Sequence, residues 1–491
     1  MYKSKTKLLS PETNLQEFAR IFDADAFREA LKNTIKEREG ETPEIISVTI
    51  PYEKTDALAV LEILSKPGEF QFYWEYPDEK LAIAAGKSIK QLKAEGSNRF
   101  RNLSECISEQ KNKIIELSDF NHSLSGVHFL GGFGFFDHKV KEGWEAFGAS
   151  AFVIPEWTFI RDGELSLLTL NLKLNEKVDV EDAQSNVFSK LYNLNLTIQK
   201  SIRRKNGLFA DTKQLDISIE DGKDELSEWV TNVNKAKGFI RSGSHNKVVL
   251  SRRLKVNTSE SIEPTKLVNQ LRKEYPSCYS FLFRPDGKNS FVGSTPERLL
   301  SVRSKYILTE GLAGSISRGG TATQDTILER QLLNSKKDNE EHFYVVRSII
   351  RRLEMFSDEI NYPSKPGIKK FTNVQHLYTP VSAWMNADHD PFEILEKLHP
   401  TPAVGGSPSG KALELIPLLE QHERGWYAGP VGWINSKGRG EFVVAIRSGL
   451  IMEDSADFFA GCGIVEDSDP ILEWEETKLK LIPMLSAIKH G

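Results

Sequence analysis

The sequence predicts an α+β protein in which large, mainly antiparallel β-sheets are flanked by helices. Three short turns, at residues 161–163, 285–287 and 435–440, each separate two strand-like runs, which is typical of β-hairpins. Hairpins join neighbouring strands in opposite directions, so they favour antiparallel sheets. Segments with apolar residues at helical spacing, for example at residues 180–202, indicate helices that bury one side against these sheets.

The composition is that of an ordinary globular protein and excludes several partners. The chain has 491 residues and a formal net charge of -5, and without a basic surplus it is not expected to bind nucleic acid. No apolar run approaches the length of a membrane-spanning helix, and the amino terminus lacks the pattern of a signal peptide. Cys106, Cys278 and Cys462 are few and far apart, which favours a reducing compartment. We therefore expect a cytoplasmic protein with no membrane association.

Two parts of the chain are expected, an amino-terminal scaffold at residues 1–210 and a second part at residues 211–491. The polar stretch around the boundary carries no clear periodicity. Within the scaffold, helical spacing predicts helices at residues 15–35 and 180–202 and a long polar helix at residues 87–117. Alternation predicts a strand at residues 45–50, aromatic composition predicts another at residues 70–76, and the turn at residues 161–163 predicts a hairpin at residues 152–172.

Two glycine motifs have some features of phosphate loops. VHFLGGFGFF, at residues 127–136, is not followed by the helical pattern that a dinucleotide-binding loop requires, so a glycine-rich strand packed closely on its neighbour is the better interpretation. GGSPSGKA, at residues 405–412, has P-loop spacing but places Ala412 where the magnesium-binding hydroxyl belongs. Neither motif supports nucleotide hydrolysis.

The second part is organised around residues 423–450, which predict a hairpin whose second strand covers residues 441–450. Arg447 lies among apolar residues of that strand, and an unpaired buried charge is costly, so this arginine needs a partner, for which a bound anion would serve. Before this hairpin, Asp224 can cap a helix that ends near residue 241, and residues 245–256 predict a strand.

Lys247 and Glu297 are candidates for acid–base chemistry. Lys247 opens the strand at residues 245–256; a charged strand end is the simpler interpretation, but a partly desolvated amine can act as a general base. Glu297 follows a Gly-Ser-Thr-Pro turn, and the proline forces the preceding residue into an extended or turn conformation. A surface glutamate is the simpler interpretation here, and a general acid is the alternative.

Acidic residues recur at helical spacing in two predicted helices. Asp338 and Glu341 share one helix face, and Glu473, Glu476 and Lys480 share a face of the other. Taken separately, each set has the pattern of a solvated charge stripe. If the two faces meet, carboxylates without histidine or cysteine favour a hard cation such as Mg²⁺.

From about Lys247 to Leu481 the chain resembles the chorismate-binding enzymes, and among them most closely the isochorismate synthases. Nine segments in the family's order and spacing carry the resemblance: KVVLSR, GSTPERLL, EGLAGS, DNEEHFYVV, LHPTPAVGG, GPVGW, EFVVAIRSG, FFAGCGIV and EWEET. In the first part, FYWEY and GGFGFF carry a looser likeness. The resemblance implies a fold like that of anthranilate synthase component I and the conversion of chorismate to isochorismate.

The resemblance also implies roles for particular residues. Lys247 would be the general base that activates water, and Glu297 the general acid that protonates the departing hydroxyl. Glu341 and Glu476 would hold Mg²⁺, with support through water from Asp338 and Glu473. Substrate-binding positions would be Gly314, His376, Ala403, Tyr427, Arg447, Gly461, Gly463 and Lys480. Of these, Arg447 and Tyr427 would bind the enolpyruvyl carboxylate, and Lys480 the ring carboxylate.

The choice within the family rests on three positions. Lys247 implies water rather than ammonia as the nucleophile, so no glutamine amidotransferase subunit is expected. Ala313 stands where aminodeoxychorismate synthase has a nucleophilic lysine, and Ala403 stands where salicylate synthase usually has threonine. Salicylate synthase remains the alternative activity, and a non-catalytic chorismate-binding subunit the alternative of another class. The product could feed menaquinone, siderophore or salicylate synthesis, and we expect a monomer or weak homodimer.

Overall fold

The computed structural model describes residues 8–38, 42–118, 122–175, 178–203, 214–220, 222 and 224–490. The helices in these ranges are α1 (Leu15–Ile21), α2 (Ala24–Glu37), α3 (Ala57–Leu64), α4 (Arg99–Asn112), α5 (Val180–Arg203), α6 (Glu225–Arg241), α7 (Pro264–Glu274), α8 (Ala322–Asn334), α9 (Lys336–Leu353), α10 (Pro391–Leu398), α11 (Ser409–Leu419) and α12 (Pro470–Ile488), with one 3-10 turn, η1 (Pro77–Glu79). The strands of the amino-terminal part are β1 (Ile45–Tyr52), β2 (Gln71–Tyr76), β3 (Leu81–Lys93), β4 (Ile114–Ser118), β5 (His128–Phe133), β6 (Ser150–Asp162) and β7 (Leu165–Lys173). The later strands are β8 (Ile217–Ile219), β9 (Lys247–Thr258), β10 (Tyr279–Arg284), β11 (Ser290–Thr295), β12 (Arg298–Arg303), β13 (Tyr306–Ser317), β14 (Glu359–Asn361), β15 (Gly367–Lys370), β16 (Val374–Trp384), β17 (Gly406–Ser407), β18 (Pro430–Asn435), β19 (Gly440–Val444), β20 (Ser448–Ile451) and β21 (Ser455–Ile464).

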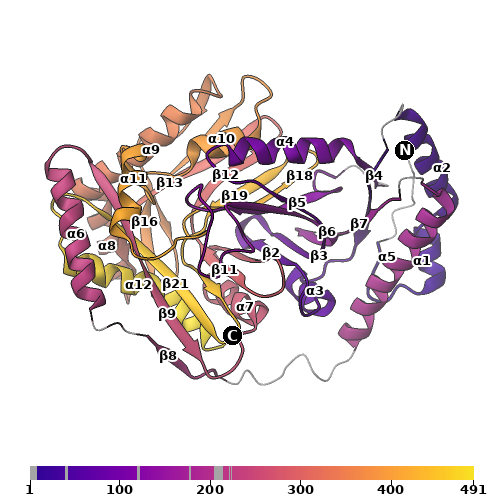
Figure 1. The fold of residues 1–491 in the computed structure, drawn as a ribbon, viewed down its shortest axis with the longest axis horizontal. Coiled ribbons are helices and arrows are strands. Elements are labelled where there is room, and N and C mark those ends of the chain that lie inside the picture. Colours follow the sequence, from indigo (N-terminus) through magenta and orange to yellow (C-terminus); the bar gives the residue numbers. More distant parts are fainter. Residues whose placement is uncertain are drawn as a thin grey trace.

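The strands form two branches that separate at β6, because the first half of this long strand pairs with β5 on one edge and β3 on the other. The β3 branch continues through β2, β10, β11, β20, β21 and β9. The β5 branch continues through β18, β19, β12, β13 and β16. All of these pairs are antiparallel, and the helices lie outside, with α6, α8 and α12 at one end of the molecule and α1, α2 and α5 at the other (Figure 1). The predicted α+β class with mainly antiparallel sheets is confirmed.

Alternation along the strands creates a separate apolar core on each sheet face. In β2, Phe72 and Trp74 belong to one buried cluster, whereas Tyr73 between them belongs to the other. In β3, Ile83 and Ala84 divide in the same way. The two-residue period of a strand sends successive side chains to opposite faces, so both faces must be covered by other elements.

The glycine-rich segment is a strand that packs closely on its neighbours, as predicted. It forms β5 between β6 and β18, and a Cβ atom on Gly131 would lie 1.9 Å from the carbonyl oxygen of Ala151. Only glycine allows the two backbones to approach this far.

The long polar helix predicted at residues 87–117 is wrong. Its first part belongs to β3 and pairs with β6, its middle is α4, and its end is β4, which pairs in parallel with β1. The apolar strand β6 offers backbone partners on both edges, and this tertiary pairing outweighs the helical preference of a lysine-rich segment. The helix predicted at residues 15–35 is also divided, because α1 ends at Ile21 with Phe22 as its C-cap, and Asp23 then caps α2.

The boundary expected at residue 210 lies outside the described residues and stays a prediction. Strands from both sides of it share the sheet, since β2 pairs with β10 and β5 pairs with β18. No helix among the described residues is long and apolar enough to cross a membrane.

Candidate active site

A cavity of about 770 Å³ lies between the far ends of the two branches. It is lined by β9 and β21 from the β3 branch, by β13 and β16 from the β5 branch, and by α9 and α12. All fourteen residues predicted from the sequence line it, namely Lys247, Glu297, Gly314, Asp338, Glu341, His376, Ala403, Tyr427, Arg447, Gly461, Gly463, Glu473, Glu476 and Lys480. This size suits a small organic ligand. The convergence supports the choice of residues, whereas their individual roles stay predictions.

Glu297 and Arg447 lie where the chain crosses from one branch to the other. Glu297 separates β11 of the β3 branch from β12 of the β5 branch, and Arg447 separates β19 from β20 in the reverse direction. The two crossings are bonded together, because Ser294 N donates to the Arg447 carbonyl at 3.0 Å and Val444 N donates to that of Glu297 at 3.1 Å. The continuous strand predicted at residues 441–450 is therefore wrong. Arg447 has a φ of 50°, which no regular strand accommodates.

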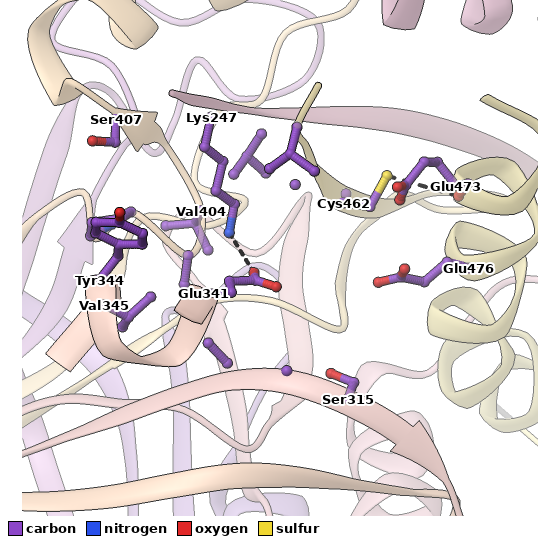
Figure 2. A pocket seen from close by; sticks show the side chains of 18 of the residues that line it. Lys247, Ser315, Glu341, Tyr344, Val345, Val404, Ser407, Cys462, Glu473 and Glu476 are labelled. Carbon is purple, nitrogen blue, oxygen red and sulfur yellow. Dashed lines mark hydrogen bonds and ion pairs between the residues drawn. The ribbon is translucent and has the colours of Figure 1, made fainter. Parts of the chain in front are cut away.

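Lys247 and Glu341 form an ion pair across the cavity. Lys247 Nζ donates to Glu341 Oε1 at 2.7 Å, and Figure 2 shows the two side chains turned toward each other. The charge of Lys247 lowers the pKa of the Glu341 carboxyl. The lysine chain passes over Gly463, where a Cβ atom would lie 2.2 Å from Lys247 Cε. A glycine at position 463 is thus required for this course of the lysine side chain.

The Glu297 carboxyl is buried and favours its protonated form. The residue is 5% exposed, and burial raises the pKa of the carboxyl to about 8, with a further contribution from the negative charge of Glu310. Lys247, Lys369 and Arg447 oppose this shift. A carboxyl that keeps its proton at neutral pH can act as a general acid.

His376 and Arg447 form a polar pair in the cavity wall. Arg447 Nη2 lies 3.3 Å from His376 Nε2, and a guanidinium can only donate, so Nε2 accepts. Burial, and then the charge of Arg447, lowers the pKa of His376 well below its usual value. The neutral ring therefore carries its proton on Nδ1, which lies 2.7 Å from Ser315 Oγ. Arg447 Nη1 is buried without a hydrogen-bond partner among the described residues, so it can bind an anionic ligand.

Acidic side chains enter the cavity from α9 and α12. Glu476 projects from α12 toward the same space as Glu341 (Figure 2), and it also pairs with Lys480 at 2.7 Å. Glu473 is buried, and burial raises the pKa of its carboxyl. Asp338 bonds to Ser335, the residue that caps α9.

These carboxylates do not form a complete metal cage. No group of three or more histidine, cysteine, aspartate or glutamate side chains among the described residues could hold a metal ion by itself. Two glutamates with oxygen ligands do fit Mg²⁺, because this ion commonly keeps several waters and takes further oxygens from an anionic substrate.

The far side of the cavity is shaped by Tyr427 and by the β9–β21 pair. The ring of Tyr427 stacks on Phe459 with centroids 5.2 Å apart, and Lys480 Nζ donates to the carbonyl of Gly461 at 2.9 Å. Gly314 lies at a bulge in the β13–β16 pair and has a φ of 73°. Ala403 lies in the loop between α10 and β17 and lines the cavity.

One supporting network was not found from the sequence. Arg424 and Glu420 form a buried ion pair at 2.6 Å, and Arg424 also donates to the carbonyl oxygens of Val249 and Val404. It thereby fixes β9 two residues from Lys247. No helix spans the two residues, because α11 ends at Leu419, so no local pattern in the sequence signals the pair.

Comparison with known proteins identifies the family. The family model described as "Chorismate binding enzyme" matches residues 29–489. The chain belongs to the chorismate-binding enzymes. The resemblance drawn from the nine segments is confirmed.

Three chorismate-binding enzymes show how far the likeness extends. The chain is 34% identical over 470 residues to the isochorismate synthase MenF of Bacillus subtilis (strain 168), and the match covers 94% of this chain and 97% of that protein. The structure of MenF, the menaquinone-specific isochorismate synthase from Escherichia coli, is similar with a TM-score of 0.72 at 24% identity, covering 94% of this chain and 99% of that one. Anthranilate synthase component I from Streptococcus pneumoniae TIGR4 gives a TM-score of 0.66 at 21% identity, covering 82% and 92%. These two structures confirm the component I-like fold.

Proposed function

We propose that this protein is an isochorismate synthase, a hydroxymutase that converts chorismate to isochorismate. The observation that carries the proposal is the presence in one cavity of an amine, a carboxyl that favours its protonated form, and two cations. Lys247 and Glu297 supply the first two, from separate elements. Arg447 and Lys480 supply positive charge for a substrate with two carboxylates.

Two cations of the cavity wall bind and orient the substrate. Arg447 Nη1 binds one carboxylate of chorismate, and His376 fixes the direction of the guanidinium by accepting from Nη2. Lys480 binds the ring carboxylate from α12. With both carboxylates held, the ring lies between the base and the acid. The reacting groups are then already positioned, which lowers the entropic cost of the reaction.

The reaction is an isomerisation in which one water enters and one leaves. Lys247 accepts a proton from water, whose oxygen adds beside the carboxylate-bearing carbon of the ring as the double bond moves. Glu297 gives its proton to the departing hydroxyl, which leaves as water. In this role the Lys247 amine acts as a general base toward the water.

The carboxylates of Glu341 and Glu476 would hold Mg²⁺, with Asp338 and Glu473 nearby. When bound, such an ion supplies positive charge for the ring carboxylate.

The direct test is to incubate the purified protein with chorismate and Mg²⁺, without ammonium, and to follow products by liquid chromatography and mass spectrometry. We expect isochorismate to accumulate to a constant ratio with chorismate, and the same ratio when the reaction starts from isochorismate. A Glu297→Gln variant and a sample with chelator are the controls. If the products are salicylate and pyruvate, the protein has salicylate synthase activity instead. Binding of chorismate with no product would favour a non-catalytic subunit.

A further inference from the structure

Glu310 is a buried carboxylate directly behind the crossing that carries Glu297. It lies on β13 and is 4% exposed. Its Oε1 accepts the backbone N–H of Arg298, the residue after Glu297, at 3.0 Å. The carboxylate therefore lies one peptide unit from Glu297 and restrains the backbone at the point where β11 passes into β12.

Lys369 forms an ion pair with this carboxylate. Its Nζ, on β15, lies 3.1 Å from Glu310 Oε2 and 3.2 Å from Oε1. The ion pair and the Arg298 N–H together satisfy both oxygens, so a buried charge is tolerated here. Glu310 does not line the cavity, and it has no place in the acid–base chemistry itself.

The charged groups that act on Glu297 come from four elements. Lys247 faces it from β9, Lys369 from β15 and Arg447 from the second crossing, and all three favour its ionised form. Among these groups Glu310 is the single negative charge, and it favours the protonated form. Without Glu310, burial alone would favour the protonated form of Glu297, and the three cations would oppose it.

We propose that Glu310 is a positioning residue for Glu297: it fixes the backbone at the crossing through the Arg298 N–H and places a carboxylate directly behind the acid. The inference rests on the proposed function, in which Glu297 is the general acid. It adds a reason why the acid keeps its proton in a cavity that must also be positive enough to bind a dianion.

The test is the pH dependence of kcat/KM for chorismate in a Glu310→Gln variant. The amide oxygen still accepts the Arg298 N–H, but the negative charge is lost, so the carboxyl of Glu297 loses its proton more readily. We expect the fall in activity at high pH to move to lower pH by about one unit. Lys369→Met removes a cation instead, and we expect it to move the fall to higher pH. Glu310→Asp retains the charge and should restore the wild-type position.

Glu441 offers a matched control, because it is a carboxylate that is 2% exposed and bonds to the side chain of Arg298 at 2.8 Å. Glu441→Gln should leave the pH at which activity falls unchanged. A Glu310→Gln profile that coincides with the wild type, or one that Glu441→Gln reproduces, would overturn the proposal. If Glu310→Gln does not fold, an unchanged or oppositely shifted profile in Lys369→Met overturns it instead.

A second measurement does not depend on turnover. The carboxyl of Glu297 can be titrated by infrared difference spectroscopy of the substrate-free protein. The spectrum of the Glu297→Gln variant is subtracted to isolate the signal of this carboxyl. We expect its protonated signal to vanish at lower pH in Glu310→Gln than in the wild type. A shifted titration without isochorismate formation would reject the proposed function and keep this inference. Isochorismate formation together with an unshifted titration would support the proposed function and reject this inference.

Discussion

Lys247 Nζ donates a hydrogen bond of 2.7 Å to Glu341 Oε1, so the amine proposed as the base is held by a carboxylate proposed as a magnesium ligand. The pair explains how a lysine that is largely buried can remain in the cavity when no substrate is bound. Each partner gives a prediction of its own.

Replacing Lys247 with methionine keeps the volume of the side chain and removes the amine. We expect turnover to fall by about 10²- to 10⁴-fold, which is the usual contribution of a general base. Chorismate affinity, measured by calorimetry, should change only a few-fold because other cations bind the carboxylates. Lys337, an exposed lysine at the same cavity, is the control, and Lys337→Met should retain turnover. Near-normal turnover in Lys247→Met would remove this lysine from the mechanism.

Replacing Glu341 with glutamine should weaken magnesium dependence and activity together. The substitution keeps the shape but removes the charge that a hard cation prefers. We expect the Mg²⁺ concentration for half-maximal activity to rise about tenfold or more. Glu340→Gln, at the adjacent exposed residue, should leave the magnesium titration unchanged. An unaltered titration in Glu341→Gln would refute the metal assignment.

Gly463→Ala tests the course of the lysine side chain. The added methyl would meet Lys247 Cε and Nζ, which are the flexible end of a side chain, so the chain should fold and the amine should move. We expect kcat to fall at least about tenfold, since a displacement near 1 Å can cost 10²-fold. Gly238→Ala, in α6 with nothing near its Cβ, should leave kcat unchanged. A Gly463→Ala variant as active as this control would contradict the geometry.

Glu297 should make the protein less stable as pH rises. In the unfolded chain its carboxyl titrates near 4.5, whereas burial raises the pKa in the folded protein to about 8. Between these values the folded state binds more protons, so the free energy of unfolding falls as pH increases. Glu297→Gln should therefore be inactive yet more stable at pH 8 to 9, by about 1 to 4 kcal/mol. Urea unfolding at pH 5 and pH 8.5 measures the difference, and an equal change at both pH values would be inconsistent with it.

The residues that the sequence singled out line one cavity, and they occur on elements that the sequence also predicts. Lys247 opens a strand, Glu297 follows an X-Pro turn, and Glu341 and Glu476 lie on amphipathic helices. Local patterns alone favoured a charged strand end, a surface glutamate and solvated charge stripes, and the resemblance carried by the order of the motifs implied the site.

The partnerships between those residues could not be predicted. Arg447 was placed in a strand because its neighbours are apolar, but those neighbours are buried at a crossing between branches rather than in a ladder. The Lys247–Glu341 pair joins residues on different elements, and Glu310 lies in a run of buried residues within β13 whose partners come from other strands. The segment at residues 87–117 was misassigned for the same reason, since its partner strand β6 is distant in sequence.

The pairing of β5 with β18 also has a consequence for how the molecule is made. Gly132 lies opposite Val431, so this strand pair joins residues that are separated by most of the chain. Closing so large a loop is slow, because its entropic cost precedes the contacts that stabilise it. During synthesis, β5 must wait until β18 has left the ribosome, with its edge unpaired. The glycines that permit the final close fit also make that unpaired edge poor in side chains, and an exposed strand edge is a template for pairing with another chain.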